Sequence, residues 1–192
     1  MMEGKYYHAM GYTNIAENTY IYTVCGAKSK KVNLRICEKF DISTNRWNIE
    51  SYLNEEKYGC GLCFFDDSMY CFGGLTKDKK TVINSLIERC NYTSLVQNWE
   101  IVLDYNYTKW TGTFLKCMPK SDYDSILIFG DNTVSIFSPS SREIERHYNF
   151  TCNLIHSCEM KEFNGVFYCY AEDKTIRGFD FEKQKHLKIA YV

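Results

Sequence analysis

The cysteines include one pair with a spacing typical of chemically active sites. Cys60 and Cys63 have the C-x-x-C arrangement that redox and zinc sites use. They lie in an apolar run expected to form a strand, where residues three apart point to opposite faces. The two thiols therefore cannot readily bind one ion, and the favoured interpretation is that both cysteines are buried in the core.

A second group lies nearer the carboxyl end, where His147 precedes Cys152, His156 and Cys158. His156 and Cys158 are two residues apart and would share a strand face, which makes a zinc site conceivable. The group has no second well-spaced pair of ligands, so a loop that enters a strand is the favoured interpretation.

Other motifs for chemistry are missing from the sequence. It contains no nucleophile motif, no phosphate-binding glycine loop and no paired-histidine metal motif. His8 begins an expected strand. His186 lies in the last copy of a sequence repeat described below, at the position that holds tryptophan in the first two copies. Both histidines are therefore predicted to be structural. We predict no catalytic residue, no metal ion and no cofactor.

Composition narrows the class of protein. The chain has 192 residues, 45% of them hydrophobic, with 11 Gly and only 2 Pro, which is typical of one folded domain. Its net charge of −1 produces no positive electrostatic field that would attract nucleic acid or an anionic membrane. With neither a long apolar segment nor a signal peptide, we expect a cytoplasmic protein whose 10 cysteines stay reduced.

One pattern occurs four times along the chain. It consists of a hydrophobic strand that ends in a small residue, a variable loop, and a second strand that ends in a turn. The first half aligns at Tyr22, Tyr70, Leu127 and Tyr168, and the second half at Asp41, Asn91, Ser138 and Asp180. A period of roughly 45–50 residues with four strands per unit is typical of propeller blades.

The second copy resembles the kelch repeat most closely. Its matching residues are Tyr70, Gly73, Gly74, Glu88 and Trp99. The corresponding residues of the first copy are Tyr22, Gly26, Glu38, Asp41 and Trp47. The third copy keeps Gly130, and the fourth has neither glycine. In this interpretation Trp47 and Trp99 are buried between blades, and the strand-end glycines permit positive φ and close backbone approach.

The resemblance implies an all-β fold of four four-stranded antiparallel blades that form an open, partial β-propeller. The expected blades cover residues of approximately 1–51, 52–104, 105–149 and 150–192. Residues 28–32 and 75–82 are expected to be loops, and residues 51–57 a connector. Neither end offers a strand to close the ring, so faces near Tyr22 and near residues 167–170 should be exposed and promote self-association.

The resemblance also implies a function, because many kelch proteins are adaptors. We expect a protein-interaction module that binds a protein partner through its inter-strand loops. We do not expect it to bind nucleic acid or membrane. The alternative is a kelch-propeller enzyme, an oxidase or isomerase, whose active site the motifs do not locate. Lysines recur in equivalent loops and predict a basic partner-binding patch, although solvated loops are the simpler interpretation. The lysines of this patch are Lys30, Lys31, Lys79 and Lys80.

Overall fold

The computed structural model describes residues 1–2, 4–78, 80–105, 115–120, 124–130, 133–149, 160–170, 174–180, 183 and 185–191. Within these ranges the regular structure is entirely β-strand, as the sequence predicts, and the pairing of strands is antiparallel. In the same ranges no helix has the length and apolar character needed to cross a membrane.

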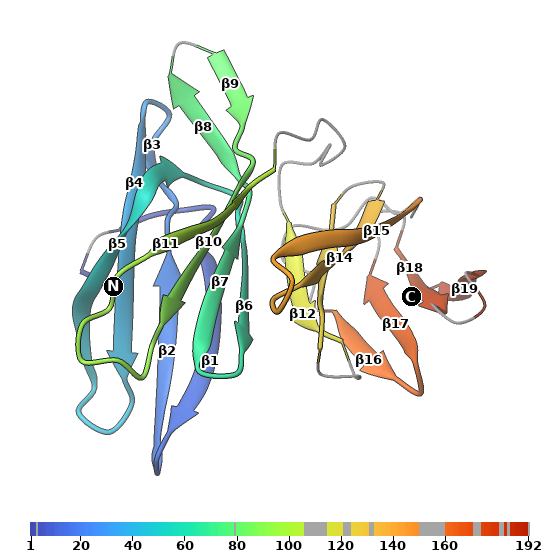
Figure 1. The fold of residues 1–192 in the computed structure, drawn as a ribbon, viewed down its shortest axis with the longest axis horizontal. Coiled ribbons are helices and arrows are strands. Elements are labelled where there is room, and N and C mark those ends of the chain that lie inside the picture. Colours follow the sequence, from blue (N-terminus) through green and yellow to red (C-terminus); the bar gives the residue numbers. More distant parts are fainter. Residues whose placement is uncertain are drawn as a thin grey trace.

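The first sheet is built from the amino-terminal strands (Figure 1). These are β1 (Ala9–Ile15), β2 (Asn18–Val24), β3 (Ala27–Ser29), β4 (Val32–Asp41) and β5 (Arg46–Lys57). β1, β2, β4 and β5 are neighbours in that order, and β3 pairs with the beginning of β4. The first sheet thus contains the four-stranded meander that the repeat predicts.

Three four-stranded sheets follow in chain order, in addition to a two-stranded sheet of β8 (Leu75–Asp78) and β9 (Lys80–Ile83), and among the described strands no sheet closes on itself. The second contains β6 (Gly61–Phe65), β7 (Ser68–Phe72), β10 (Leu86–Asn91) and β11 (Glu100–Asp104). The third contains β12 (Lys116–Pro119), β13 (Ile126–Phe129), β14 (Thr133–Ser138) and β15 (Glu143–Asn149). The fourth contains β16 (Lys161–Phe163), β17 (Val166–Tyr170), β18 (Thr175–Asp180) and β19 (Lys185–Tyr191).

The apolar runs of the central strands are explained by packing on both faces. In β7, Met69 and Cys71 join the core against the first sheet, whereas Tyr70 and Phe72 join the core against the third. A third core, which includes Phe129 and Phe167, joins the third sheet to the fourth. Successive side chains of a strand point to opposite faces, so a strand between two sheets must be apolar throughout.

The turns between strands use the side chains that the sequence indicates. Asp41 Oδ1 accepts hydrogen bonds from the backbone N–H groups of Ser43 and Thr44, at 2.8 and 3.3 Å. Asn91 Oδ1 accepts equivalent bonds one repeat later, from Thr93 at 2.9 Å and Ser94 at 3.1 Å. These Asx turns close the β4–β5 and β10–β11 connections.

The strand-end glycines allow close approach of the backbone, as predicted. Gly26 and Gly74 have φ values of 109° and 106°. A Cβ atom at Gly74 would lie 2.9 Å from the carbonyl oxygen of Tyr58, and one at Gly26 would lie 3.1 Å from that of Tyr6. A side chain at either position would therefore collide with the segment that leads into the same sheet.

Three segments that the sequence analysis expects to be irregular are largely strand, although residues 30–31 form a turn. Residues 51–57 continue β5, so the first sheet extends beyond the expected boundary at residue 51. The cause is period-two burial, in which Ser51 and Leu53 are buried while Tyr52 and Asn54 are exposed. Residues 28–32 belong to the β3–β4 hairpin. Residues 75–78 and 80–82 lie in two paired strands, β8 and β9.

Candidate functional site

One face of the first sheet is left uncovered by the described sheets. Met10 and Tyr12 of β1 point away from the second sheet and are 65% and 71% exposed. Their counterparts in the second sheet, Leu62 and Phe64, pack into the core against the first sheet. Equivalent positions of the repeat thus carry large side chains in both sheets, but only those of the second are covered. We call this surface of the first sheet the outer face.

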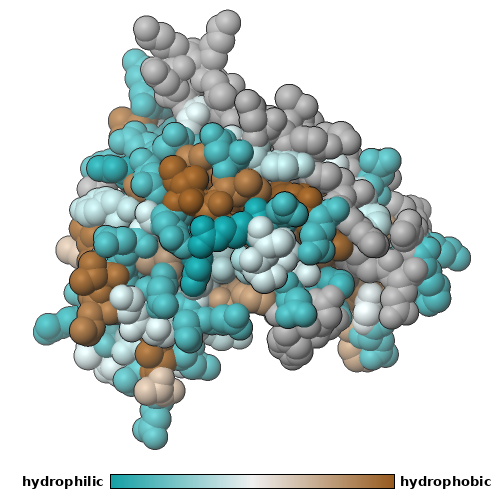
Figure 2. Space-filling model, in the orientation of Figure 1, coloured by the Kyte–Doolittle hydropathy of each residue, from teal (hydrophilic) through white to brown (hydrophobic). Residues whose placement is uncertain are grey.

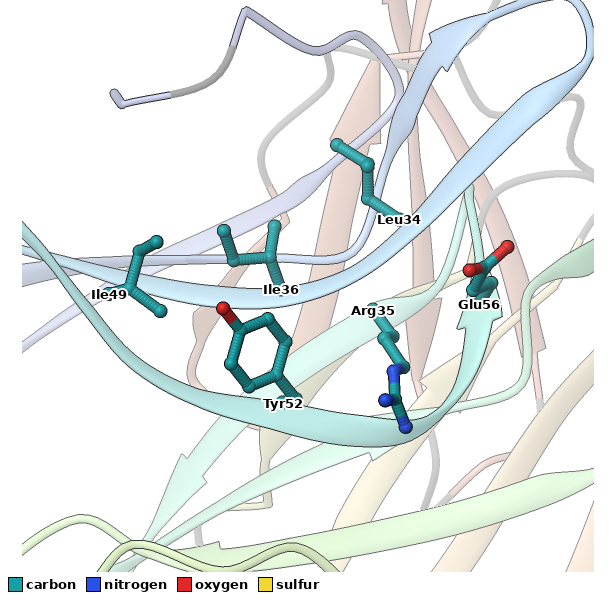
Figure 3. Close-up of a pocket in the computed structure, with 6 residues that line it drawn as sticks. All are labelled: Leu34, Arg35, Ile36, Ile49, Tyr52 and Glu56. Carbon is teal, nitrogen blue, oxygen red and sulfur yellow. The ribbon is translucent and has the colours of Figure 1, made fainter.

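The outer face includes a pocket of about 280 Å³ between β4 and β5 (Figure 3). The Arg35 guanidinium lies over the ring of Tyr52, with its carbon 5.9 Å from the ring centroid. The rest of the pocket wall consists of three hydrophobic side chains, Leu34, Ile36 and Ile49, and the carboxylate of Glu56. Figure 2 shows that hydrophobic residues on the visible side of the molecule gather in patches bordered by hydrophilic ones. The pocket could take an apolar side chain from a partner.

The predicted basic loops lie at the ends of two neighbouring hairpins. Lys30 and Lys31 form the exposed turn between β3 and β4. β8 contacts both β4 and β5, so the β8–β9 hairpin lies beside this turn (Figure 1). Lys79 lies outside the described residues, and of Lys80 only the backbone in β9 is described.

The two glutamates of the repeat motif are buried in ion pairs. Glu88 is fully buried, and its Oε1 accepts a hydrogen bond of 2.7 Å from Lys57 Nζ. Its Oε2 accepts two bonds of 2.7 Å from the backbone N–H and the side-chain amide of Asn54. Glu38 lies 2.9 Å from Lys5 Nζ and accepts a bond of 2.6 Å from the backbone nitrogen of Met2. Both glutamates therefore have structural roles.

Each lysine is followed by a tyrosine, and this Lys-Tyr pair, which the sequence analysis missed, marks the link into a sheet. Lys5-Tyr6 and Lys57-Tyr58 precede the first strands of their sheets. Tyr6 exchanges two backbone hydrogen bonds with Ala27, and Tyr58 exchanges two with Leu75. The recurrence of Lys-Tyr one repeat apart is the signal that could have identified this link.

Three cysteines from separate parts of the sequence meet between the first and second sheets. The Sγ atoms of Cys25, Cys60 and Cys71 all lie within 4.8 Å of one another, and all three residues are buried. We call them the cysteine cluster. Cys63 lies in the other core, against the third sheet, so the two thiols of the C-x-x-C pair are separated as predicted.

The pKa values of the three thiols in the cysteine cluster are shifted in different directions. Burial raises the pKa of the Cys25 thiol and that of Cys71. Hydrogen bonds from those two thiols lower the pKa of Cys60. Burial by itself would lower the pKa of Lys57, but Cys71, Cys25 and Glu88 outweigh it, so the pKa lies above its ordinary value.

The remaining histidines and cysteines offer no second described cluster. Burial, followed by the charge of Lys5, lowers the pKa of His8, which favours its neutral form. Cys152, His156 and Cys158 lie outside the described residues, as do the side chains of His147 and His186.

The aromatic motif residues differ in burial. Tyr22, Tyr70 and Trp99 are buried, and Trp99 Nε1 donates a 3.0 Å hydrogen bond to Ser51 of the first sheet. Trp47 is only half-buried against Phe40, because it lies on the outer face. Its expected burial between two sheets is therefore wrong in this structure.

The expected exposed faces also need correction. Tyr22 points into the core against the second sheet, and the exposed side chains are instead those of its β1 neighbours Met10 and Tyr12. At the other end of the array, Phe167 and Cys169 are buried against the third sheet, whereas Val166, Tyr168 and Tyr170 are half-buried. The remaining motif glycines lie in turns, Gly73 with a φ of 53° and Gly130 with a hydrogen bond to Thr133.

No model of a known protein family matches the chain, and no curated protein matches its sequence. Functional assignment therefore depends on three features of the molecule, namely the outer face, the basic hairpins and the cysteine cluster.

Proposed function

We propose that the chain is a kelch-type β-propeller sector that acts as a protein-interaction module. Four successive antiparallel meanders that pack through three cores support this architecture. The segments that lead into successive sheets are joined by backbone hydrogen bonds, from Gly59 to Tyr7 at 2.8 Å and from Leu115 to Gly59 at 3.2 Å. Such contacts between adjacent repeats are what a propeller requires.

The observation that carries the proposal is the outer face. Its residues occupy the positions that the second sheet uses to pack against the first, yet Met10 and Tyr12 remain exposed. An exposed apolar patch on a repeat array marks a binding site for another protein surface. The partner is therefore a protein with an apolar sheet face, either a further blade or a second copy of the chain.

We expect a double variant, Met10→Asp with Tyr12→Asp, to abolish association through the outer face. Two carboxylates in a packed apolar interface would lose their hydration without gaining partners. Light scattering of the purified full chain measures the effect: the wild type should form a dimer or larger species, and the variant a monomer that still unfolds cooperatively. Leu95→Asp, on an exposed turn of the second sheet, is the matched control and should associate like the wild type. A monomeric wild type that ignores a hydrophobic dye would contradict self-association.

The basic hairpins are proposed to add an electrostatic contribution to partner binding. Reversing the charge of Lys30, Lys31, Lys79 and Lys80 to glutamate should weaken binding of a polyglutamate peptide and reduce its salt dependence. The melting temperature should stay nearly constant, because Lys30 and Lys31 are exposed. Arg46→Glu, at the other end of the first sheet, serves as the control. Equal binding of the peptide by the charge-reversed chain would mean that these lysines are ordinary solvated residues with no role in partner binding.

A further inference from the structure

The cysteine cluster has the geometry of a metal site that joins two sheets. Cys25 follows β2 of the first sheet, whereas Cys60 immediately precedes β6 and Cys71 lies in β7 of the second sheet. Their Sγ atoms lie within 4.8 Å of one another. A Zn–S distance of about 2.3 Å in tetrahedral geometry separates the sulfurs by about 3.8 Å. Small side-chain movements would therefore bring the three sulfurs onto one ion.

The backbone at Cys25 supplies an independent observation. Cys25 has a φ of 57°, in the left-handed region, and occupies the repeat position where the second sheet has Gly73 with a φ of 53°. A residue with a Cβ atom is strained in this conformation, whereas glycine is not. Strain of this kind persists only where the surrounding structure fixes it, and it is enriched at functional sites. Here it brings a sulfur atom into the cluster.

The charge around the cluster suits an anionic metal–thiolate complex. Three thiolates with Zn²⁺ have a net charge of −1, which is unfavourable in a buried site unless a cation lies nearby. Lys57 is a fully buried cation that interacts electrostatically with all three cysteines. Its ammonium group also donates a 2.7 Å hydrogen bond to Glu88, so its charge is shared between that carboxylate and the cluster.

We propose that Cys25, Cys60 and Cys71 bind one thiophilic metal ion, of the kind represented by Zn²⁺ and Cu⁺, through three sulfur ligands. Soft thiolates select these ions over Mg²⁺ or Ca²⁺. On binding, three S–H bonds break, three metal–sulfur bonds form, and the protons pass to the buffer without any change of oxidation state. The ion joins the first sheet to the second, because each sheet contributes ligands.

The test uses the full chain, reduced and freed of metal, titrated anaerobically with Zn²⁺ and, in parallel, with Cu⁺ against a chromophoric chelator. We expect one equivalent of at least one ion to bind and to raise the melting temperature. Cys25→Gly removes one ligand and restores the glycine that the backbone favours, so it should fold while its metal affinity falls by more than about 100-fold. Cys63→Ser removes a buried thiol from the neighbouring core and should bind metal like the wild type.

Three results would overturn the proposal. The first is failure of the wild-type chain to bind either ion stoichiometrically. The second is a Cys25→Gly variant that binds as tightly as the wild type. The third is a disulfide between two cluster cysteines in the natively purified chain, because oxidised sulfurs cannot serve as thiolate ligands. Cobalt substitution provides a further readout, since thiolate ligation gives charge-transfer absorption that Cys25→Gly should lose.

Discussion

Replacing Lys57 with methionine is expected to lower the free energy of unfolding by about 3–5 kcal/mol. The change leaves the Glu88 carboxylate fully buried with only its two hydrogen bonds from Asn54. A buried charge that has lost its counter-ion keeps its desolvation penalty without the attraction that offset it. Urea denaturation of the metal-free chain, followed by tryptophan fluorescence, measures the difference.

Two control variants separate loss of charge pairing from loss of packing. Adding Glu88→Gln to Lys57→Met removes the unpaired charge and should recover part of the lost stability. Glu100→Gln removes one member of the exposed Arg89–Glu100 pair, which is 3.5 Å long, and should change stability by less than about 0.5 kcal/mol. If Lys57→Met and Glu100→Gln had equal effects, the buried pair would have no special role in stability.

Trp99→Ala is expected to lower the free energy of unfolding by about 3–5 kcal/mol, whereas Trp47→Ala should lower it by about 1 kcal/mol. The two tryptophans occupy the same repeat position, so each is the matched control of the other. Trp99 is buried at 7% exposure and donates to Ser51 across the sheet–sheet contact. Trp47 contacts Phe40 on the outer face, where solvent remains close.

The comparison of the two tryptophans also tests the outer face. Chemical denaturation at low protein concentration keeps the chain monomeric, and the difference between the variants should then be largest. Equal losses for Trp47→Ala and Trp99→Ala under these conditions would mean that the outer face is covered within the monomer. That result would contradict both the exposure of Trp47 and the proposed docking surface.

Local pattern was sufficient to predict the central strands of the sheets and two of their turns. Alternation and apolar runs identify β2, β7 and β13, and the side chains of Asp41 and Asn91 identify the turns. The same rule failed for residues 51–57, where charged and polar side chains hid a strand with one buried face. Trp47 was misplaced because a motif specifies which face a residue occupies but not what covers that face.

The cysteine cluster could not have been found from spacing. Cys25, Cys60 and Cys71 belong to different strands or links, and only the packing of two sheets brings their sulfurs together. The sequence drew attention instead to Cys60 and Cys63, whose side chains enter different cores. The Lys-Tyr pair was detectable in principle, because it recurs in register with the repeat.

The order of the buried ion pairs along the chain has a consequence for protein synthesis. Lys5 precedes Glu38, and Lys57 precedes Glu88, so each cation leaves the ribosome before the carboxylate that it neutralises. When the strand of either carboxylate emerges, the lysine that pairs with it is already outside the ribosome. Nascent chains fold from the amino terminus as segments become available. The first two sheets can therefore fold during translation without exposing an unpaired acid to the growing core.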